Sequence, residues 1–146
     1  MEKKFPPILV IDDNPFCLGV IEIMIKEWFG IRIDRALSGN QGLNHVQSRF
    51  TSYVEDKVPM YKLIIIDYSM PTMCGLSTAT FICNLLTDDF LSDSERESMR
   101  PYICCTSKQQ EKYTKAEMME HGVDEVEAKP LRQATLKKLL RQVSLI

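Results

Sequence analysis

The stretch Leu63-Ile64-Ile65-Ile66-Asp67 places four large apolar residues directly before an acid. An uninterrupted apolar run of this kind is typical of a strand that is buried on both faces of a parallel sheet. The run ends on Asp67, and Tyr68-Ser69-Met70-Pro71 then turns the chain away. Open α/β sheets bind their ligands beside the carboxyl ends of such strands. Asp67 is therefore either a turn-capping carboxylate or a functional group, and the rest of the chain favours the second interpretation.

The composition indicates an ordinary globular chain. Of its 146 residues, 45% are hydrophobic and 26% are charged, which predicts one domain over residues 1–146 with its core at about 8–143. The net charge of −2 gives no reason to expect a nucleic-acid partner. No apolar run approaches the roughly 20 residues of a membrane span, and no apolar signal segment follows the charged first residues. We therefore expect a cytoplasmic location without membrane contact.

The five cysteines follow no metal-ligand spacing. They are scattered, mostly within apolar segments: Cys17, Cys74, Cys83, Cys104 and Cys105. Free thiols in a reducing compartment are the expected state. A cysteine nucleophile assisted by His45 or His121 is the alternative, but no motif supports it.

Apolar strands and amphipathic helices alternate five times along the chain. The patterns predict strands at residues 8–11, 31–36, 63–67, 102–105 and 123–128. They predict helices at residues 15–29, 38–50, 75–86, 109–121 and 131–143. A short extra helix is expected after Ser92, because Ser92-Asp93-Ser94-Glu95 has the spacing of a capping box. This alternation predicts an α/β fold with a parallel sheet that helices cover on both faces.

Local signals define some of these helices more closely. Asn14-Pro15 predicts the start of the first helix and Gly30 its end. We count Trp28 among the apolar positions of that helix. Residues 51–60 carry mixed charge and a proline, and we interpret them as a long surface loop. The last helix has basic residues opposite its leucines, which we interpret as a solvated face and not as a nucleic-acid recognition surface: Arg132, Lys137, Lys138 and Arg141.

Polar residues follow four of the predicted strands. They are, in chain order, Asp12 and Asp13, then Asp67, Thr106 and Lys129. Parallel strands bring their carboxyl ends to one edge of a sheet. Three crowded carboxylates repel one another unless a cation joins them, and Mg²⁺ suits a site of oxygen ligands that stays open to water and phosphate. The hydroxyl and the ammonium group would then donate to a bound phosphoryl group.

This constellation resembles the motif of the response-regulator receiver domain. Its anchors occur in order over most of the chain: Asp12-Asp13, Asp67 with Met70-Pro71-Thr72-Met73-Cys74-Gly75, Thr106-Ser107 and Lys129-Pro130. The resemblance implies a (βα)5 flavodoxin-like, doubly wound parallel sheet with strand order 2-1-3-4-5. It also implies a two-component phosphorelay in which Asp67 accepts a phosphoryl group from phosphohistidine, with Mg²⁺ as the cofactor.

The resemblance further implies a role for each site residue. The expected ligands of Mg²⁺ are Asp13, Asp67 and the backbone carbonyl of Ser69, with Asp12 acting mostly through water. Thr106 and Lys129 are expected to hold the phosphoryl oxygens, and the Lys129–Pro130 bond is commonly cis in receivers. The implied partner is a histidine kinase or a histidine phosphotransfer protein. The implied activity is limited to self-phosphorylation and slow autodephosphorylation, without enzymatic turnover of a substrate.

Some residues depart from the receiver pattern. Val126 occupies the position where receivers often have a rotating Phe or Tyr, so the coupling between Thr and that aromatic is not expected. The segments 47–60 and 87–100 are longer than a minimal receiver needs, and they resemble insertions in the receivers of hybrid histidine kinases. In receivers, the positions of Ser69 and Lys108 border the path of the attacking water, and these two side chains predict the slow phosphoryl loss of a relay.

Two other functions fit parts of the pattern. A hydrolase of the haloacid-dehalogenase type also begins from a strand-ending aspartate with Mg²⁺. That chemistry needs a second acid two residues later, where this chain has Ser69. A degenerate receiver that serves only for docking would be expected to lose an acid or the lysine, and this chain keeps both.

Overall fold

Five parallel strands form a single sheet in the order β2-β1-β3-β4-β5. The structure is a computed structural model that describes residues 5–87, 91–108 and 113–146. The strands are β1 (Ile8–Ile11), β2 (Ile33–Ala36), β3 (Leu63–Asp67), β4 (Tyr102–Ser107) and β5 (Glu125–Ala128). The expected α/β flavodoxin-like fold and its strand order are confirmed.

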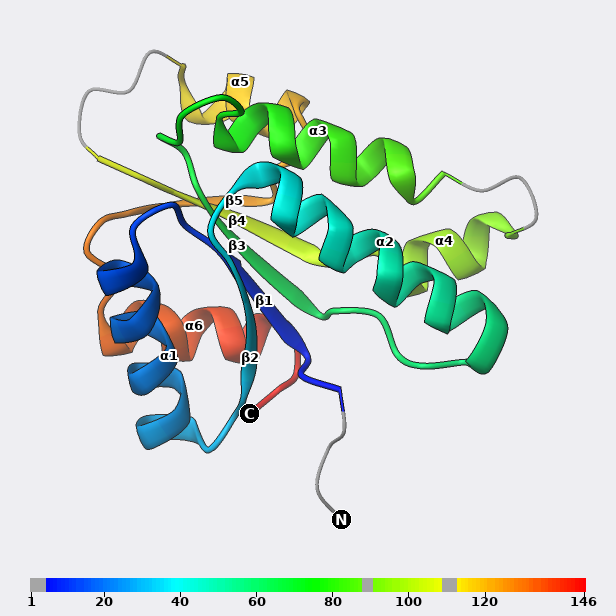
Figure 1. Cartoon of the computed structure of the whole chain (residues 1–146), viewed down its shortest axis with the longest axis horizontal. Helices are drawn as coiled ribbons and strands as arrows, with labels where there is room; N and C mark the ends of the chain where they lie inside the picture. Colours follow the sequence, from blue (N-terminus) through cyan, green and yellow to red (C-terminus); the bar gives the residue numbers. More distant parts are fainter. Residues whose placement is uncertain (1–4, 88–90, 109–112) are drawn as a thin grey trace.

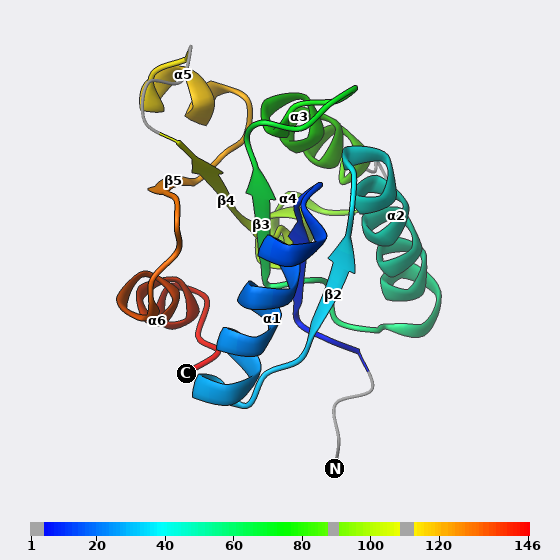
Figure 2. The same ribbon diagram turned by 60° about the vertical axis from the view of Figure 1, so that its left-hand side comes forward.

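Helices cover both faces of this sheet, as Figures 1 and 2 show. One face is covered by α1 (Pro15–Phe29) and α6 (Gln133–Gln142). The other is covered by α2 (Gly39–Asp56), α3 (Gly75–Leu85), α4 (Asp93–Met99) and α5 (Lys115–Glu120). Because both faces are buried, the central strands need apolar side chains at every position, which explains their uninterrupted apolar runs.

Two hydrophobic cores lie on opposite sides of the sheet. Leu9 and Ile11 of β1 point into the core beneath α2 and α3. Ile8 and Val10 point into the core beneath α1 and α6. The residues of β3 alternate in the same way, and they pair in register with β1 on one side and β4 on the other. Burial on both sides therefore holds the carboxyl ends of β1 and β3 next to each other.

Helix α1 begins and ends where its local signals predict. The Asn14 side chain accepts hydrogen bonds from the backbone N–H groups of Phe16 and Cys17, and Gly30 ends the helix at a left-handed φ of 67°. The prediction was wrong for Trp28, whose surface is 45% exposed. Phe29, the next residue, packs against the core beneath α1 and α6 instead.

Helix α2 is longer than predicted, and this corrects the interpretation of residues 51–60 as a loop. The helix continues to Asp56, and Lys57 ends it with a φ of 57° and an N–H that donates to Ser52 and Tyr53. Its last turns have a buried side, because Phe50 and Tyr53 stack at 6.4 Å and Arg49 is buried. Most of the 47–60 segment is therefore helical.

The two short helices differ in how well the sequence predicted them. The capping box of α4 is present, since Ser92 accepts from the Glu95 N–H and Glu95 accepts from the Ser92 N–H; residues 88–90 before it lie outside the described residues. In the described part of the predicted helix 109–121, Tyr113 and Thr114 precede the helix instead of belonging to it. Residues 109–112 lie outside the described residues, and α5 begins only at Lys115, because the Thr114 side chain accepts from the Glu117 N–H.

The cysteines and the helices agree with two expectations from the sequence, free thiols and no membrane-spanning helix within the described residues. All five cysteines are free thiols. Within the described ranges, none of the helices combines the length and the apolar character that crossing a membrane requires.

Candidate functional site

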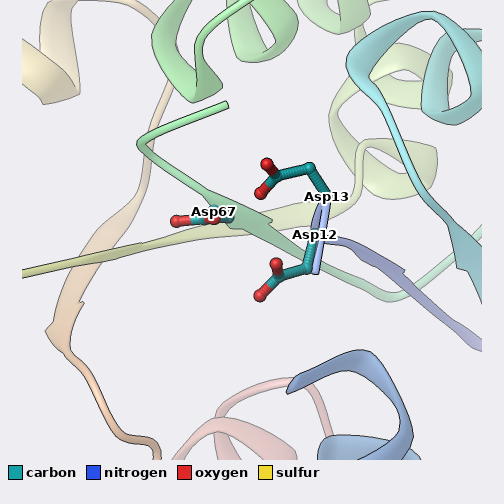
Figure 3. A group of neighbouring side chains, drawn as sticks. All are labelled: Asp12, Asp13 and Asp67. Carbon is teal, nitrogen blue, oxygen red and sulfur yellow. The ribbon is translucent and has the colours of Figure 1, made fainter. Parts of the chain in front are cut away.

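Five predicted side chains meet at the carboxyl edge of the sheet: Asp12, Asp13, Asp67, Thr106 and Lys129. They come from the ends of four neighbouring strands, so the parallel topology brings them together. Figure 3 shows the three acids, which project in the same general direction from β1 and β3. Their ligand oxygens lie within 4.8 Å of one another. Asp12 and Asp67 are buried, whereas Asp13 is exposed.

Lys129 binds two of these acids. Its Nζ lies 2.9 Å from Oδ1 of Asp67 and 3.4 Å from Oδ2 of Asp12. The backbone N–H of Lys129 donates to the Ser107 carbonyl at 2.9 Å, which fixes the residue to the end of β4. The bond between Lys129 and Pro130 is cis, as the resemblance to receivers implied.

The charges of the site are unbalanced. Burial raises the pKa of Asp67, and the ammonium group of Lys129 only partly offsets this effect. Burial alone would lower the pKa of Lys129, but its bonds to Asp67 and its proximity to Asp12 outweigh burial and raise that pKa. Lys129 contacts two of the three clustered carboxylates, so within this cluster negative charge exceeds the charge of the one ammonium group that binds it. The site therefore favours a further cation.

The chemistry of the donor atoms fits Mg²⁺. The clustered ligands are carboxylate oxygens, which hard divalent cations prefer, and Asp13 opens the cluster to solvent. Oxygens this close together can meet on one ion after small rotations of their side chains. Ser69 lies beside them on the loop after β3, and its N–H donates to Oδ1 of Asp67 at 3.3 Å. The predicted Mg²⁺ site therefore has the residues that it requires.

Thr106 lies beside Asp67 on the neighbouring strand. It pairs in register with Asp67, and its carbonyl accepts from the Tyr68 N–H at 2.9 Å. The Thr106 side chain is buried, and its hydroxyl lies 3.5 Å from the carbonyl of Ile66. Val126 of β5 pairs with Cys105 and packs against the core beneath α3. A valine there has no ring that could rotate between a buried and an exposed position.

Gly75 is a site residue whose contact the sequence analysis missed. Its N–H donates to the Tyr68 carbonyl at 2.9 Å. A Cβ at this position would lie 2.5 Å from the carbonyl oxygen of Asp67. Any side chain would therefore push the loop away from the strand that carries Asp67. The signal available in the sequence was a glycine between the turn and the start of the next helix.

A cavity of about 440 Å³ opens directly beside the acids. Its polar rim includes Asp12, Thr106 and Lys129, and its wall is formed by α1 and the start of the segment after β5. Apolar side chains line much of that wall, including Phe16, Val20 and Leu131. Phe16 is 77% exposed. The acid cluster is thus approached over an apolar surface.

Comparison with known proteins gives matches of two kinds. The sequence model of the response regulator receiver domain family matches residues 8–141. The receiver domain of the histidine kinase CKI1 from Arabidopsis thaliana, complexed with Mg²⁺, has a similar structure, with a TM-score of 0.74 and 22% identity over 94% of this chain and 91% of that chain. The chemotaxis protein CheY4 from Vibrio cholerae has a TM-score of 0.69 and 20% identity over 93% of this chain and 96% of that chain. A search of the curated proteins found no match.

These matches agree with the geometry of the strand ends. At such low identities the two structures show the fold alone, whereas the family match covers both ends of the sheet and all four anchors of the site. The chain belongs to the response regulator receiver domain family and is a receiver domain of a two-component system.

Proposed function

We propose that this receiver accepts a phosphoryl group on Asp67 from the phosphohistidine of a histidine kinase or a histidine phosphotransfer protein. The proposal rests on one observation above all, the buried contact of 2.9 Å between Lys129 Nζ and Asp67 Oδ1 inside a cluster of three acids. The reaction takes place in the cytoplasm and needs Mg²⁺. The chain acts as a phosphoacceptor and not as an enzyme that turns over a substrate.

Asp67 is the nucleophile of the proposed transfer. A carboxylate oxygen forms a bond to phosphorus while the P–N bond of phosphohistidine breaks, and the electron pair of that bond returns to the imidazole nitrogen. Lys129 favours the ionised form of Asp67, which attack requires. The same ammonium group and the hydroxyl of Thr106 then donate to the phosphoryl oxygens.

The metal would be held by this chain's own oxygen atoms. Asp13, Asp67 and the backbone carbonyl of Ser69 are the proposed direct ligands, and Asp12 acts through water. When bound, Mg²⁺ supplies positive charge that offsets the acids and the phosphoryl oxygens. Burial of Asp12 and Asp67 keeps these charges away from bulk solvent, so each of them acts strongly on the reacting group.

The apolar cavity beside the acids supports a protein as the donor. A small phosphorylated metabolite would gain little from Phe16 and Val20, whereas the helix that carries a phosphohistidine can cover both. Because the cavity is continuous with Asp12 and Lys129, a partner seated there would present its imidazole to Asp67. The long 47–60 segment and the likeness to the CKI1 receiver support a receiver of the hybrid-kinase type.

The experiment uses phosphoramidate, which contains the P–N bond of the proposed reaction, and acetyl phosphate as a second donor. Each is incubated with the protein with and without Mg²⁺, and intact-mass spectrometry then measures the phosphorylated fraction. Wild type is expected to be modified only in the presence of Mg²⁺. Asp67→Asn is expected to stay unmodified, because an amide is not a nucleophile for phosphorus.

Asp56→Asn is the matched control, since it changes an exposed acid at the end of α2 in the same way. It should be phosphorylated like wild type. Labelling of Asp67→Asn at the wild-type level would disprove the assignment of Asp67. A wild type that stays unmodified with both donors would favour a module used only for docking, and continuous turnover of the donors would favour a hydrolase.

A further inference from the structure

The loop between β3 and α3 contains a strained residue. Thr72 has a φ of 70°, a conformation that a β-branched side chain rarely adopts. The Met73 N–H donates to the Pro71 carbonyl at 2.7 Å, so Thr72 is the centre of a tight γ-turn. Such a conformation persists only where neighbouring structure holds it. This loop also carries Ser69, and its first residues follow Asp67 directly.

The neighbouring structure is the first turn of α2. A Cβ on Gly39 would lie 2.5 Å from the Thr78 hydroxyl and 2.9 Å from the sulfur of Met73. Gly39 therefore lets Met73, the residue after the strained turn, pack directly on the backbone of α2. Thr78 is fully buried in the same contact. Its hydroxyl and its N–H both donate to the carbonyl of Cys74, the last residue of the loop, at 3.0 Å.

The first turn of α2 is also held by close contacts on its other sides. A Cβ on Gly42, one turn later, would overlap a methyl group of Ile11, so the helix is seated closely on β1. Ser38 caps the helix by accepting from the Gln41 N–H at 3.1 Å. We therefore expect Met73 of the loop and Thr78 of α3, and not α2, to move when a side chain is added at position 39.

We infer that Gly39 is a positioning residue for the phosphoacceptor loop. Its missing side chain allows α2 to hold Met73 and Thr78, which keeps the strained turn closed and sets the position of Ser69 beside Asp67. This inference rests on the proposed function, because it takes Ser69 and Asp67 as ligands of Mg²⁺. It extends the site to a helix that contributes none of the proposed ligands.

The test compares two substitutions of glycine by alanine. Gly39→Ala is expected to weaken Mg²⁺ binding by about tenfold, the size of effect seen when the supports of metal ligands are changed. Gly19→Ala is the control, since a Cβ at Gly19 in α1 would meet nothing within 4 Å. It should leave the affinity for Mg²⁺ unchanged and raise the thermal midpoint, because alanine favours a helix. Isothermal titration with MgCl₂ measures the affinity.

Substitutions at Thr78 identify the contact itself. Thr78→Ala removes the hydroxyl that the new methyl group meets, so the double variant Gly39→Ala/Thr78→Ala should recover most of the affinity for Mg²⁺. Thr78→Val keeps an atom in the place of the hydroxyl, so it should not restore Gly39→Ala. Met73→Ala removes the loop side chain that packs on Gly39 and adds no atom to the contact. It should also weaken Mg²⁺ binding, because the loop loses its support from α2.

The outcomes separate this inference from the function on which it rests. A wild type that binds no Mg²⁺ and accepts no phosphoryl group would overturn both. A functional wild type with unchanged Mg²⁺ affinity in Gly39→Ala would overturn only the positioning role. Rescue by Thr78→Val as complete as that by Thr78→Ala would also overturn it. If Gly39→Ala does not fold, normal Mg²⁺ affinity in Met73→Ala overturns the role instead.

Discussion

The two ends of the sheet hold their charges in opposite ways. At the carboxyl edge, Asp12 and Asp67 share the ammonium group of Lys129, and Asp13 lies in the same cluster. At the amino edge, each of two acids has a guanidinium group of its own, from Arg49 or Arg100. Crowded like charges destabilise a fold unless a ligand of opposite charge joins them. The balanced edge stabilises the fold, and the unbalanced edge carries the proposed functional site.

Arg49 is the most completely enclosed cation at the amino edge. Only 6% of its surface is exposed, and it binds Oδ2 of Asp34 at 3.2 Å. Its other N–H groups donate to the carbonyls of Pro6 at 2.9 Å and Pro59 at 3.3 Å. The guanidinium also lies 3.9 Å from the centre of the Tyr61 ring, whose hydroxyl donates to the same oxygen of Asp34. These contacts join α2 to β2 and to the segment before β1.

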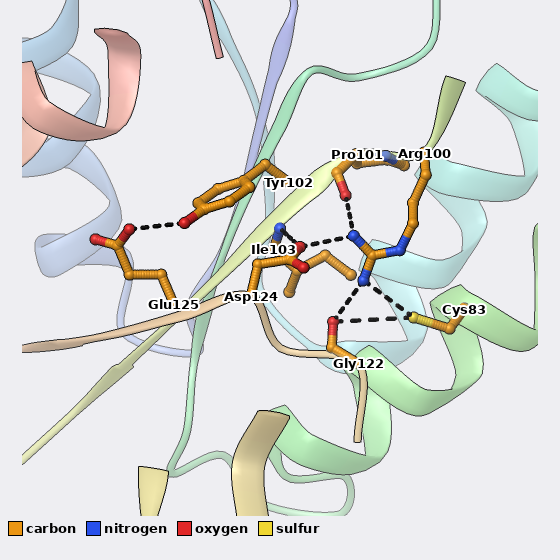
Figure 4. A network of polar contacts seen from close by, with 8 residues as sticks. All are labelled: Cys83, Arg100, Pro101, Tyr102, Ile103, Gly122, Asp124 and Glu125. Atoms are coloured by element: carbon orange, nitrogen blue, oxygen red, sulfur yellow. Dashed lines mark hydrogen bonds and ion pairs between the residues drawn. The ribbon is translucent and has the colours of Figure 1, made fainter. Parts of the chain in front are cut away.

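Arg100 forms a comparable network between β4 and β5, which Figure 4 shows. It binds Asp124 at 2.7 Å and donates to the Gly122 carbonyl at 2.9 Å. Asp124 also accepts from the Ile103 N–H at 2.8 Å, so one carboxylate ties α4 to the beginnings of both strands. Burial alone would lower the pKa of Arg100, but its bond to Asp124 outweighs burial and raises it. Every partner in this network is supplied by the chain itself.

Breaking the balanced edge at Arg49 should have the largest effect on stability. Arg49→Met keeps the apolar stem but leaves the Asp34 carboxylate without its cation, so we expect a loss of about 3 kcal/mol in the free energy of unfolding. Urea denaturation measures this loss. Arg35→Met is the control, because Arg35 pairs with Glu22 on the surface and should cost less than about 1 kcal/mol. Equal midpoints for Arg49→Met and wild type would contradict the prediction.

A smaller loss is expected at Asp124. Asp124→Asn keeps an acceptor for the Ile103 N–H but removes the negative charge beside Arg100, so we expect a loss of about 1.5 kcal/mol. Both side chains are partly exposed, which limits the effect. Urea denaturation again provides the measurement, and phosphorylation by acetyl phosphate should be unchanged. If Asp124→Asn is as stable as wild type but is no longer phosphorylated, the amino edge takes part in phosphorylation and its role is not purely structural.

Substitutions at Lys108 and Ser69 should change the rate of phosphoryl loss from Asp67 only modestly. Lys108 lines the cavity beside Lys129, and Ser69 is exposed two residues after Asp67. We expect Lys108→Ala and Ser69→Asn each to accelerate phosphoryl loss a few-fold, which corresponds to roughly 1 kcal/mol of barrier. Intact-mass spectrometry after removal of the donor follows the decay. Lys137→Ala, an exposed lysine of α6, should decay like wild type. If Lys108→Ala and Ser69→Asn do the same, neither residue controls the rate.

The smallest change in stability is expected at Asp13, and it tests the unbalanced edge most directly. Asp13→Asn relieves repulsion from Asp12 and Asp67, so the thermal midpoint without Mg²⁺ should be unchanged or higher. The rise in midpoint that Mg²⁺ gives to wild type should disappear, because a proposed ligand is lost. Scanning calorimetry with and without MgCl₂ measures both quantities. A clear drop in the metal-free midpoint would indicate a structural role for Asp13.

The sequence predicted the carboxyl edge better than the amino edge, for a physical reason. Each site residue lies at or just after the carboxyl end of a strand, and parallel topology brings these local positions to one common edge. The closeness of Gly39 and Gly75 to the loop could not be predicted in this way. Those contacts depend on distances of a few ångströms between elements, and a glycine in the sequence does not indicate what its missing side chain would meet.

Long-range pairing explains the error in α2. Residues 51–56 are mostly polar, so local propensity favours a loop, yet tertiary contacts supply most of the stability of a helix in a folded protein. Here Arg49 reaches Asp34, a partner fifteen positions earlier in the chain, and Tyr53 packs on Phe50. No periodic pattern in the sequence indicates that Arg49 pairs with Asp34. The same holds for Arg100 and Asp124, which are separated by a whole strand and helix.

The position of Trp28 has a consequence for how this protein can be observed. It is the only tryptophan of the chain, and it lies at the end of α1 remote from the acids, roughly 20 Å along the helix from Asn14. Its half-exposed indole will report unfolding of the helix by a change in fluorescence, while Mg²⁺ or a phosphoryl group at Asp67 will leave its emission almost unchanged. Tyr68 directly follows Asp67, so Tyr68→Trp in a Trp28→Phe background would move the fluorophore to the acceptor and make each binding event visible in real time.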